Sequence, residues 1–478
     1  MNNNVLIGAI ASTAIAMMGT SIAKADTHKT TGMKEKPNIV LMLIDDMGYS
    51  DITCNGSNYH RTPHIDALAE SGIRFTNGYS ACTVSSPTRA ALMTGKYPAR
   101  LHVTDWIPGQ NHKTAPMSPP QWCKYLPEEE ITIAEVLRDN GYKTWHVGKW
   151  HLDGKTSYTP EIQGFDVAIG VNTKGDDLGD YSPKKQEKLC KKYFPPYCLT
   201  NLPDGPSDEY LTDRLSAEAV SLIKQSDEEP FFLYFAHYAV HTPLMAKPDL
   251  EAKYKGLIDK DYFQQNATYA AMVESVDQSV AQVVAALKDK GKLENTIFIF
   301  VSDNGALCQS VPNNPFRAGK GSAYEGGVRV PMIVSWPGHI KPNTLCDYPA
   351  ITMDITATLM DIVNSPQIQK IDGISLLPAL KGTTMKERPL YWHYPHNHRG
   401  GSLTYSAIRL GDWRLVEHLW NNQIELYNLK EDVSEQYNLV ESNSKQAQKL
   451  YSMLKKWREK VDAQMPVPNP NYKPQKTY

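Results

Sequence analysis

The chain has 478 residues, of which 41% are hydrophobic and 21% are charged, as is usual for a large globular protein. Its 50 basic and 52 acidic residues give a formal net charge of −2, which does not favour a surface that binds nucleic acid or anionic membranes. Length alone suggests two or three domains, although α/β enzymes often keep one large domain.

The first 25 residues have the pattern of a signal peptide. Val5–Ala23 is apolar and rich in small residues, and Ala23-Lys24-Ala25 has the small-x-small form of a cleavage site. We therefore expect residues 1–25 to be removed and the protein to be exported, to the periplasm or outside the cell. An uncleaved membrane anchor is the alternative, because no Lys or Arg precedes the apolar run and the run is almost long enough to span a bilayer.

The chain contains seven cysteines, so at least one of them is unpaired within the chain. They include no closely spaced pair of the C-x-x-C type, so a zinc site is not expected. Cys190 and Cys198 flank a loop rich in Lys, Pro and Tyr, and would bridge it in an oxidising compartment. The sequence leaves this pairing open.

The first predicted element after a polar lead-in is a strand. Asn38–Ile44 is a nearly continuous apolar run, which is typical of a strand buried on both faces. It ends in Asp45-Asp46, and two adjacent carboxylates there are costly unless a cation or hydrogen bonds compensate them. Ligands of open α/β sheets bind at this edge, which favours a functional role. A helix cap or a turn is the alternative interpretation.

A helix is predicted within Cys82–Arg100. A serine at its start would cap the first turn, Pro87 suits the first helical position, and Gly95 suits the exit. A helix N-terminus favours an anion, and Arg89 follows Ser85 by four residues, so it returns to the same face. A surface helix with an ordinary Ser-Pro cap is the alternative.

Three further apolar runs predict buried strands, and each is followed by polar residues. They are Lys143–Val147 with Lys149 and His151, Phe231–Phe235 with His241, and Thr296–Val301 with Asp303 and Asn304. Helical spacing separates them, in Ile131–Asn140, Thr212–Ser226 and Asn266–Lys290. Strands alternating with helices predict an α/β fold whose parallel or mixed sheet is covered on both sides. If the strands run parallel, their polar ends converge on one edge.

The composition changes after about residue 366, which predicts a catalytic domain over residues 26–366 and a smaller α+β domain over 367–478. The smaller domain should hold an antiparallel sheet and a helix, in Leu390–Tyr394, Ser406–Arg409, Trp413–Glu417, Glu425–Tyr427 and Glu441–Val461. The tail from Pro466 is rich in Pro, Asn and Lys and is expected to be loosely ordered.

The segment around Ser85 resembles the signature of the type I sulfatases, which reads Cys or Ser, any residue, Pro, Ser or Thr, Arg, and a short run to Thr-Gly. In this chain the matching residues are Ser85, Ser86, Pro87, Thr88, Arg89 and Thr94-Gly95. Cys82 lies three residues too early for the first position, so the chain resembles the serine type of the family. The resemblance extends over Asn38–Leu439. It implies an alkaline-phosphatase-like fold, with a central mixed sheet flanked by helices and a smaller C-terminal domain that contributes to the substrate pocket.

The resemblance also implies a cofactor and a reaction. A maturase oxidises the first signature residue to formylglycine, here at Ser85. One hydroxyl of the hydrated aldehyde attacks sulfur while the alcohol leaves, and the second hydroxyl then releases sulfate from the covalent sulfo-enzyme. One calcium ion, which prefers oxygen donors, would be bound by Asp45, Asp46, Ser85, Asp303 and Asn304.

Further residues acquire catalytic roles by the same resemblance. Arg89 would hold the hydrated aldehyde and the surroundings of the ion. The groups that bind the sulfate oxygens would be Lys149, His241 and Lys320. The partners of the formylglycine hydroxyls would be Lys96 and His151. His241 is the preferred acid for the leaving alcohol, with Lys320 next, and His151 is the preferred base of the second step.

Substrate-binding residues are expected in two stretches. The first follows the signature helix, with the candidates Arg100, His102, Asp105 and Trp106. The second, Tyr391–Arg399, is dense in His and aromatic residues, and its candidates for sugar contacts are Trp392, His393 and His396. Structural packing is the alternative for the second stretch.

The sequence therefore predicts an exported, calcium-dependent sulfatase that removes O-sulfate from a sulfated glycan, such as a glycosaminoglycan or a mucin. It leaves the sugar and the sulfate position open, and it favours neither a nucleic-acid partner nor a membrane span after signal cleavage. A phosphohydrolase of the same fold that uses unmodified Ser85 is the second hypothesis, although two-metal phosphatases typically have Asp-His where this chain has Asp303-Asn304. A non-catalytic glycan-binding relative is the third, and the intact set of ionisable residues argues against it.

Overall fold

The computed structural model describes residues 36–110, 113–154, 158–172, 190, 192–257, 259, 261–366, 369–398 and 403–472. All of them belong to the unit Lys36–Tyr478. The predicted signal peptide and Arg399 lie outside the described residues.

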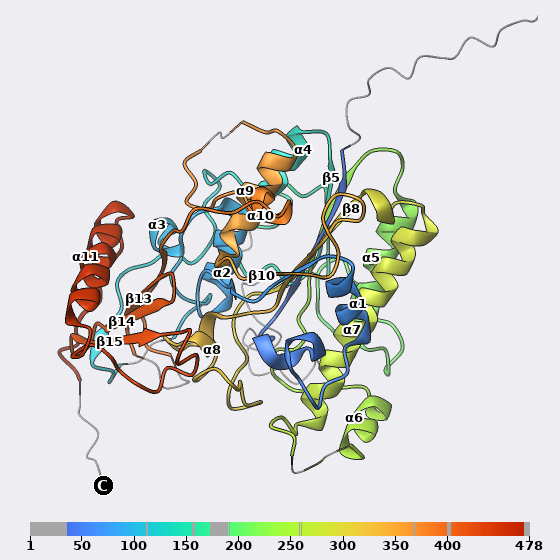
Figure 1. Cartoon of the computed structure of the whole chain (residues 1–478). Coiled ribbons are helices and arrows are strands. Elements are labelled where there is room, and N and C mark those ends of the chain that lie inside the picture. The colour runs from blue at the N-terminus through green and yellow to red at the C-terminus, as the bar shows by residue number, and fades with distance from the viewer. Residues whose placement is uncertain are drawn as a thin grey trace, which may run out of the picture. The chain divides into compact units, whose positions relative to one another are not determined.

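An eight-stranded mixed sheet forms the centre of this unit (Figure 1), in the order β10-β2-β9-β8-β1-β7-β5-β6. Its strands are β1 Asn38–Ile44, β2 Ile73–Phe75, β5 Lys143–Gly148, β6 Val167–Ile169, β7 Phe231–Ala236, β8 Thr296–Ser302, β9 Met332–Ser335 and β10 Thr344–Cys346. The neighbours β8, β1, β7 and β5 run parallel, as predicted, whereas β9 is antiparallel to β8 and β2. The carboxyl ends of four strands therefore lie along one edge.

The apolar character of β1 follows from its central place. It is paired on both sides, with Leu41 opposite Tyr234 of β7 and Ile299 of β8. Alternate residues of β1 pack into the two cores on either face of the sheet, so every position is buried.

Helices cover both faces (Figure 1). One face packs against α1 Pro63–Glu70, α5 Leu211–Gln225, α6 Pro248–Lys255 and α7 Ala267–Asp289. The other packs against α2 Ser85–Thr94, α3 Pro98–Leu101, α4 Ile133–Asp139, α9 Met353–Ile362 and α10 Leu377–Leu380. The predicted α/β fold is thus confirmed. In the described ranges, no helix is both long enough and apolar enough to cross a membrane.

The C-terminal part forms the predicted antiparallel sheet and helix. The strands are β12 Leu390–Tyr394, β13 Tyr405–Leu410, β14 Trp413–His418 and β15 Gln423–Asn428, and the helix is α11 Ser444–Lys460. Tyr391 and Trp457 stack with ring centroids 4.7 Å apart, which joins α11 to the sheet. The prediction of a loose tail from Pro466 is wrong for its first residues, because β16 Val467–Pro468 pairs with β4 Met117–Ser118.

A buried ion network joins the C-terminal sheet to the rest of the chain. Arg414 of β14 lies 3.2 Å from a carboxylate oxygen of Glu325 and 3.3 Å from one of Glu435, and none of the three side chains is exposed. Glu325 opens the short helix α8, Glu325–Val328, and its backbone N–H donates to Glu435 at 2.7 Å. Removing one partner of such a network would leave an uncompensated buried charge.

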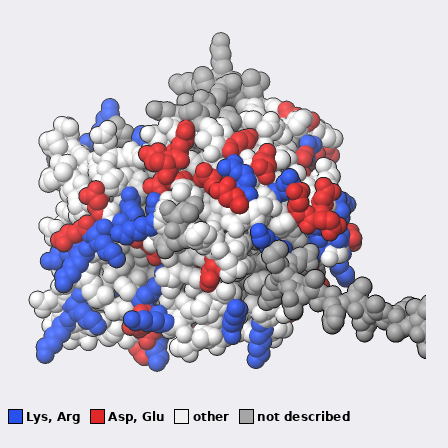
Figure 2. Space-filling view, turned by 90° about the horizontal axis from the view of Figure 1, so that it is seen from above, with Lys and Arg blue, Asp and Glu red and all other residues white. Residues whose placement is uncertain are grey.

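Figure 2 shows acidic and basic side chains interspersed on the face in view, as the small net charge leads one to expect. Cys190 and Cys198, whose pairing the sequence left open, form a disulfide, and the other five cysteines, which all lie in the described ranges, form none there.

Candidate functional site

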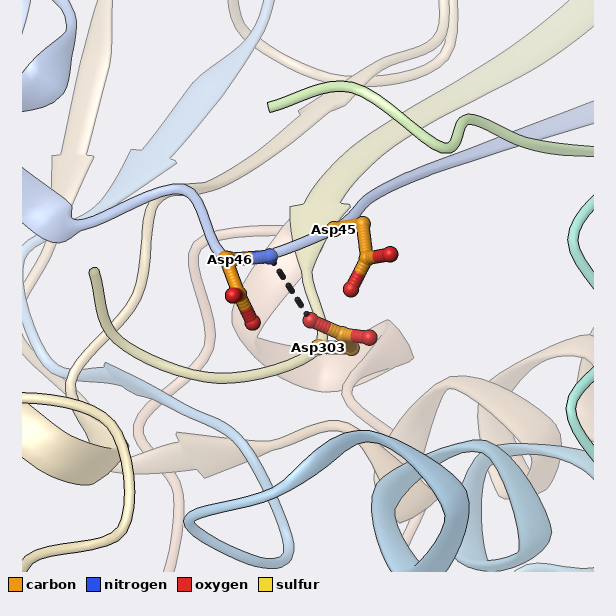
Figure 3. Close-up of side chains that lie close together, drawn as sticks. All are labelled: Asp45, Asp46 and Asp303. Carbon is orange, nitrogen blue, oxygen red and sulfur yellow. Dashed lines mark hydrogen bonds between the residues drawn. The ribbon is translucent and has the colours of Figure 1, made fainter. Parts of the chain in front are cut away.

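Three carboxylates meet at the carboxyl ends of β1 and β8 (Figure 3). Asp45 and Asp46 follow β1, Asp303 follows β8, and one oxygen of each lies within 4.8 Å of an oxygen of the other two. All three residues are at most 2% exposed. The backbone N–H of Asp46 donates to Oδ1 of Asp303 at 3.1 Å, which holds the two loops together. Buried carboxylates this close repel one another unless positive charge or hydrogen-bond donors compensate them.

Three cations supply that compensation. Arg89 of α2 donates from Nε and Nη2 to Oδ2 of Asp303, at 3.1 and 2.8 Å. The ammonium groups of Lys149 and Lys320 lie 2.6 Å from Asp45 and 2.7 Å from Asp46. Burial acts to lower the pKa of Arg89, but the charges of Asp303 and Asp45 outweigh it and raise that pKa above its usual value.

The turn after β5 brings Lys149 into this group. Gly148 has φ +101°, a left-handed conformation that favours glycine. A Cβ at this position would lie 2.0 Å from the carbonyl oxygen of Ala236 on β7, so a side chain has no room. The backbone N–H of Lys149 donates to the same carbonyl at 2.8 Å. The lysine is therefore fixed at the end of two adjacent strands.

Ser85 lies at the first position of α2, with its hydroxyl between two of the carboxylates. Its Oγ is 2.6 Å from Oδ2 of Asp303 and 3.1 Å from Oδ1 of Asp45. The prediction of a serine cap with Pro87 at the first helical position is wrong. Val84 is the N-cap residue, no side chain caps the helix, and Pro87 is third. The hydroxyl of Ser85 binds carboxylates instead of the helix N–H groups.

Asn304 provides an observation that bears on a metal ion. Its Nδ2 donates to Oδ1 of Asp46 at 2.7 Å and to the carbonyl of Gly305 at 3.0 Å. Its Oδ1 is buried and has no hydrogen-bond partner among the residues that the structure describes. A buried oxygen without a donor is costly, and a divalent cation would satisfy it together with the three carboxylates beside it. The donor set therefore fits a metal ion that prefers oxygen.

Two further candidates are histidines. The Nδ1 of His241 lies 2.6 Å from the carbonyl oxygen of Thr242, so this nitrogen carries the proton and donates. The Nε2 of His241 faces Oδ2 of Asp46 at 3.6 Å and is the atom turned to the carboxylates. His151 is buried, and its Nε2 donates to the carbonyl of Ile107 at 2.6 Å.

One residue that positions His241 was not recognised from the sequence. Tyr193, in the loop closed by the disulfide, is fully buried, and its hydroxyl lies 2.7 Å from the carbonyl of Tyr238 and 2.9 Å from that of His241. The segment from about Asp153 to Asp208 shows no periodicity, so nothing in it singled out Tyr193.

Comparison with known proteins identifies the family of the chain that carries this cluster. The family model described as Sulfatase matches residues 37–365. The chain belongs to the sulfatase family. A second model, described as N-sulphoglucosamine sulphohydrolase, C-terminal, matches residues 319–464.

Individual relatives agree with this sulfatase assignment. A protein named Sulfatase from Formosa agariphila is 31% identical, over 92% of each chain. Human N-acetylgalactosamine-6-sulfatase is 32% identical over 83% of this chain and 74% of its own. The crystal structure of Ps i-CgsB in complex with k-i-k-neocarrahexaose matches with a TM-score of 0.74 and 31% identity, covering 92% of this chain and 95% of that chain. This chain is therefore a sulfatase, a hydrolase.

Lys96 is not with the other candidates. It follows the far end of α2, a ten-residue helix of about 15 Å that begins at Ser85, and its ammonium forms an ion pair with Glu130. A lysine at that end has no access to the Ser85 hydroxyl, so the structure does not support its predicted role as a partner of the formylglycine hydroxyls.

Four of the substrate-binding candidates of this sulfatase contact other parts of the protein. Arg100 binds both oxygens of Asp372, at 2.8 and 2.7 Å, and Nε2 of His102 lies 2.9 Å from the carbonyl of Asp462. Trp392 is 2% exposed and donates to the carbonyl of Ser80, and the ring nitrogens of His393 are 2.8 Å from Ser406 and from the carbonyl of Gln464. For Trp392 and His393 these contacts correspond to the packing alternative.

The remaining three candidates lie nearer the site. Trp106 is half-buried, and the next residue, Ile107, donates its N–H to Ser86 Oγ and accepts from His151. Asp105 is buried, accepts from the hydroxyl of Tyr394 at 2.7 Å, and faces Nδ1 of His396 at 3.7 Å. Burial raises the pKa of Asp105 to about 7 and lowers the pKa of His396 to about 3. His396 is therefore neutral near pH 7 and acts through hydrogen bonds.

Proposed function

We propose that this sulfatase removes an O-sulfate group from a sulfated glycan, using formylglycine at position 85 and one calcium ion. The observation that carries the proposal is the place of the Ser85 hydroxyl, between Asp45 and Asp303 and beside the guanidinium of Arg89. The glycan is inferred from a relative named N-acetylgalactosamine-6-sulfatase and from a similar structure solved with k-i-k-neocarrahexaose.

The ligands of the ion would be Asp45, Asp46, Asp303, Asn304 and the modified residue 85. They offer hard oxygen donors, which suit calcium better than zinc. When bound, the ion would polarise a sulfate oxygen and stabilise negative charge on it.

Formylglycine at position 85 would supply two hydroxyls on one carbon, one to attack sulfur and one to release the sulfate afterwards. The N-terminal end of α2 adds a positive dipole end at this place. Because the residue is serine, a maturase that accepts serine would be required. This requirement separates the protein from family members whose first signature residue is cysteine.

The surrounding residues would bind and orient the sulfate. Lys149 and Lys320 each carry a charge that an incoming sulfate oxygen would share with Asp45 and Asp46. His241, protonated on both ring nitrogens, would donate the Nε2 proton to the leaving sugar oxygen, because a sugar alkoxide leaves poorly without one. His151 would act as the base of the second step.

Residues 1–25 would direct the chain to the periplasm or outside the cell, where the disulfide between Cys190 and Cys198 would persist. The catalytic domain would be residues 26–366, and the smaller domain, 367–478, would contribute to the substrate pocket through the segment that holds His396 beside Asp105.

The experiment that tests the proposal is peptide mass spectrometry across Cys82–Arg89 on active protein from its native source. Conversion of Ser85 to formylglycine removes two hydrogens, about 2 Da, and should be found at that residue alone. Ser86 in the same peptide is the internal control. Fully active protein with unmodified Ser85 would contradict the formylglycine mechanism and favour a phosphatase-like use of the serine.

A second arm uses Ser85→Cys and Ser85→Ala, produced in a host whose maturase accepts cysteine. The cysteine variant should gain formylglycine and desulfate sugars, and the alanine variant should stay inactive with either maturase. Equal activity of both variants would show that residue 85 is not the nucleophile.

A further inference from the structure

An open hollow lies beside the loop that follows β7. It measures about 500 Å³ and is lined by Cys190, Lys192, Phe194, Ser207, Pro243 and Met245. Most of its lining is apolar, and among the described residues that line it Lys192 is the charged one. Hollows that combine apolar surface with a few polar groups are where ligands bind most often.

The hollow lies beside the segment that carries His241. Pro243 stands two residues after His241, whose Nε2 faces Asp46 at 3.6 Å. Tyr193, between two lining residues of the opposite wall, binds the carbonyl of His241 at 2.9 Å. The disulfide between Cys190 and Cys198 closes that wall into a loop. Both walls are thus tied to the histidine.

The position of the hollow beside His241 indicates which part of the substrate it would contact. If His241 donates to the leaving sugar oxygen, the sugar lies on the His241 side of the sulfate. A glycan chain that continues from that sugar then passes the residues that follow His241, which form one wall of the hollow.

The chemistry of the lining selects an occupant. The C–H face of a pyranose ring is apolar and would lie on Phe194, Pro243 and Met245, while Lys192 would bind an anion. Among the described residues, no carboxylate forms an ion pair with Lys192, so its charge is available to an anionic group. A sugar residue that carries its own sulfate has both features.

We propose that this hollow binds a second sulfated sugar residue of the same glycan, adjacent to the residue that loses its sulfate. The proposal rests on the proposed function, and it assigns the preferred substrate class: an oligosaccharide with at least two sulfated residues. Lys192 recognises the second sulfate, and Phe194 supports the ring.

The test compares kcat/KM for sulfated galactose and N-acetylgalactosamine monosaccharides with kcat/KM for k-i-k-neocarrahexaose and chondroitin sulfate oligosaccharides. The unmodified chain should prefer one of the multiply sulfated oligosaccharides by roughly tenfold or more, because binding of the second sulfate adds a charge-assisted contact. Lys192→Ala and Phe194→Ala should remove that preference and leave monosaccharide turnover unchanged. Lys192→Arg should keep it, and Lys445→Ala, at an exposed lysine of α11, is the matched control.

Two results would overturn the subsite. One is a native enzyme with equal kcat/KM for single sulfated sugars and for every oligosaccharide. The other is a Lys192→Ala variant that loses the same factor on both classes, because Lys192 would then support the loop and not a second sulfate. If the protein desulfates none of these sugars, the result contradicts the proposed function as well as the subsite. This outcome differs from the loss of the oligosaccharide preference alone, because in that case the monosaccharides are still desulfated.

Discussion

Arg89 donates two hydrogen bonds to a single oxygen, Oδ2, of Asp303, and neither side chain is exposed to solvent. The same oxygen accepts from the hydroxyl of Ser85, while Oδ1 accepts from the backbone of Asp46. One carboxylate thus connects the signature helix, the loop after β1 and the loop after β8. The geometry of the whole site depends on this residue.

Asp303→Ala should therefore abolish both metal binding and turnover. Loss of the carboxylate removes a ligand and leaves the buried charge of Arg89 with Asp45 alone, 3.8 Å away. We expect activity to fall at least about a thousandfold and the metal content, measured by elemental analysis, to fall with it. Asp45→Ala should do the same, whereas Asp289→Ala, at the exposed end of α7, should not. Full activity after exhaustive chelation, or two zinc ions per chain, would reject the calcium site.

His241→Ala should distinguish two kinds of substrate. Loss of a proton donor should slow sugar sulfates by roughly 10²–10⁴-fold, because their alkoxides leave poorly. An aryl sulfate, whose phenolate leaves readily, should lose much less. The measurement is kcat on a sugar sulfate and on an aryl sulfate with the same protein. Equal losses on both would assign His241 to sulfate binding only.

Tyr193→Phe should reproduce this pattern in weaker form, because it removes only the hydroxyl that holds the carbonyls of Tyr238 and His241. The lost hydrogen bond should cost about 1–3 kcal/mol of folding stability, and sugar sulfate turnover should fall more than aryl sulfate turnover. Tyr210→Phe is the matched control, since the hydroxyl of Tyr210 binds the carbonyl of Met245, four residues beyond His241. If both variants change the two activities by the same factor, Tyr193 has only a structural role.

Asp105 should make the stability of the protein depend on pH. Burial raises its pKa from 3.8 to about 7, so between these values the unfolded chain has released a proton that the folded chain retains. The free energy of unfolding should therefore fall as pH rises from about 4 to 7, by up to about 1.4 kcal/mol per unit, and level off above. His396 stays neutral in this range because burial lowers its pKa to about 3.

The measurement for Asp105 is urea unfolding of the native chain and of Asp105→Asn between pH 4 and 9. As pH rises to 7, the free energy of unfolding of the native chain should fall relative to that of the asparagine variant. Asp289→Asn, at an exposed position, should show a difference that is constant with pH. A constant difference for Asp105→Asn would show that this carboxyl is ionised throughout.

The sequence predicted the central sheet and the long helices well because their signals are local. The strand Asn38–Ile44 is found at those bounds, since it is buried on both faces and all of its residues after Asn38 are apolar. Helix α7 lies within the predicted range because Asn266 caps its start, accepting from the N–H of Tyr269. The three-residue strands β2, β6 and β10 were not predicted, because three residues carry no usable periodicity.

The sequence could predict those residues of the site whose position is determined by the end of a strand. Residues that directly follow parallel strands, such as Asp45, Lys149 and Asp303, are brought together by the topology itself. Residues beyond a helix are not, which is why Lys96 is paired with Glu130 instead. Likewise, the side chains of β12 alternate between the two faces of its sheet, and Trp392 lies on the buried face. A sequence rich in aromatic residues does not show which face of the strand is buried.

The buried ion network of Arg414 sets a condition on protein engineering. A C-terminal sheet taken from another sulfatase to change the sugar preference would have to bring a cation that reaches Glu325, and an acid in place of Glu435. Without them, the new junction would leave unpaired charges in the interior. The chimaera would then fail to fold, and its sugar specificity could not be measured. Exchange of the exposed loops between the strands, with β14 retained, is the route that leaves this junction intact.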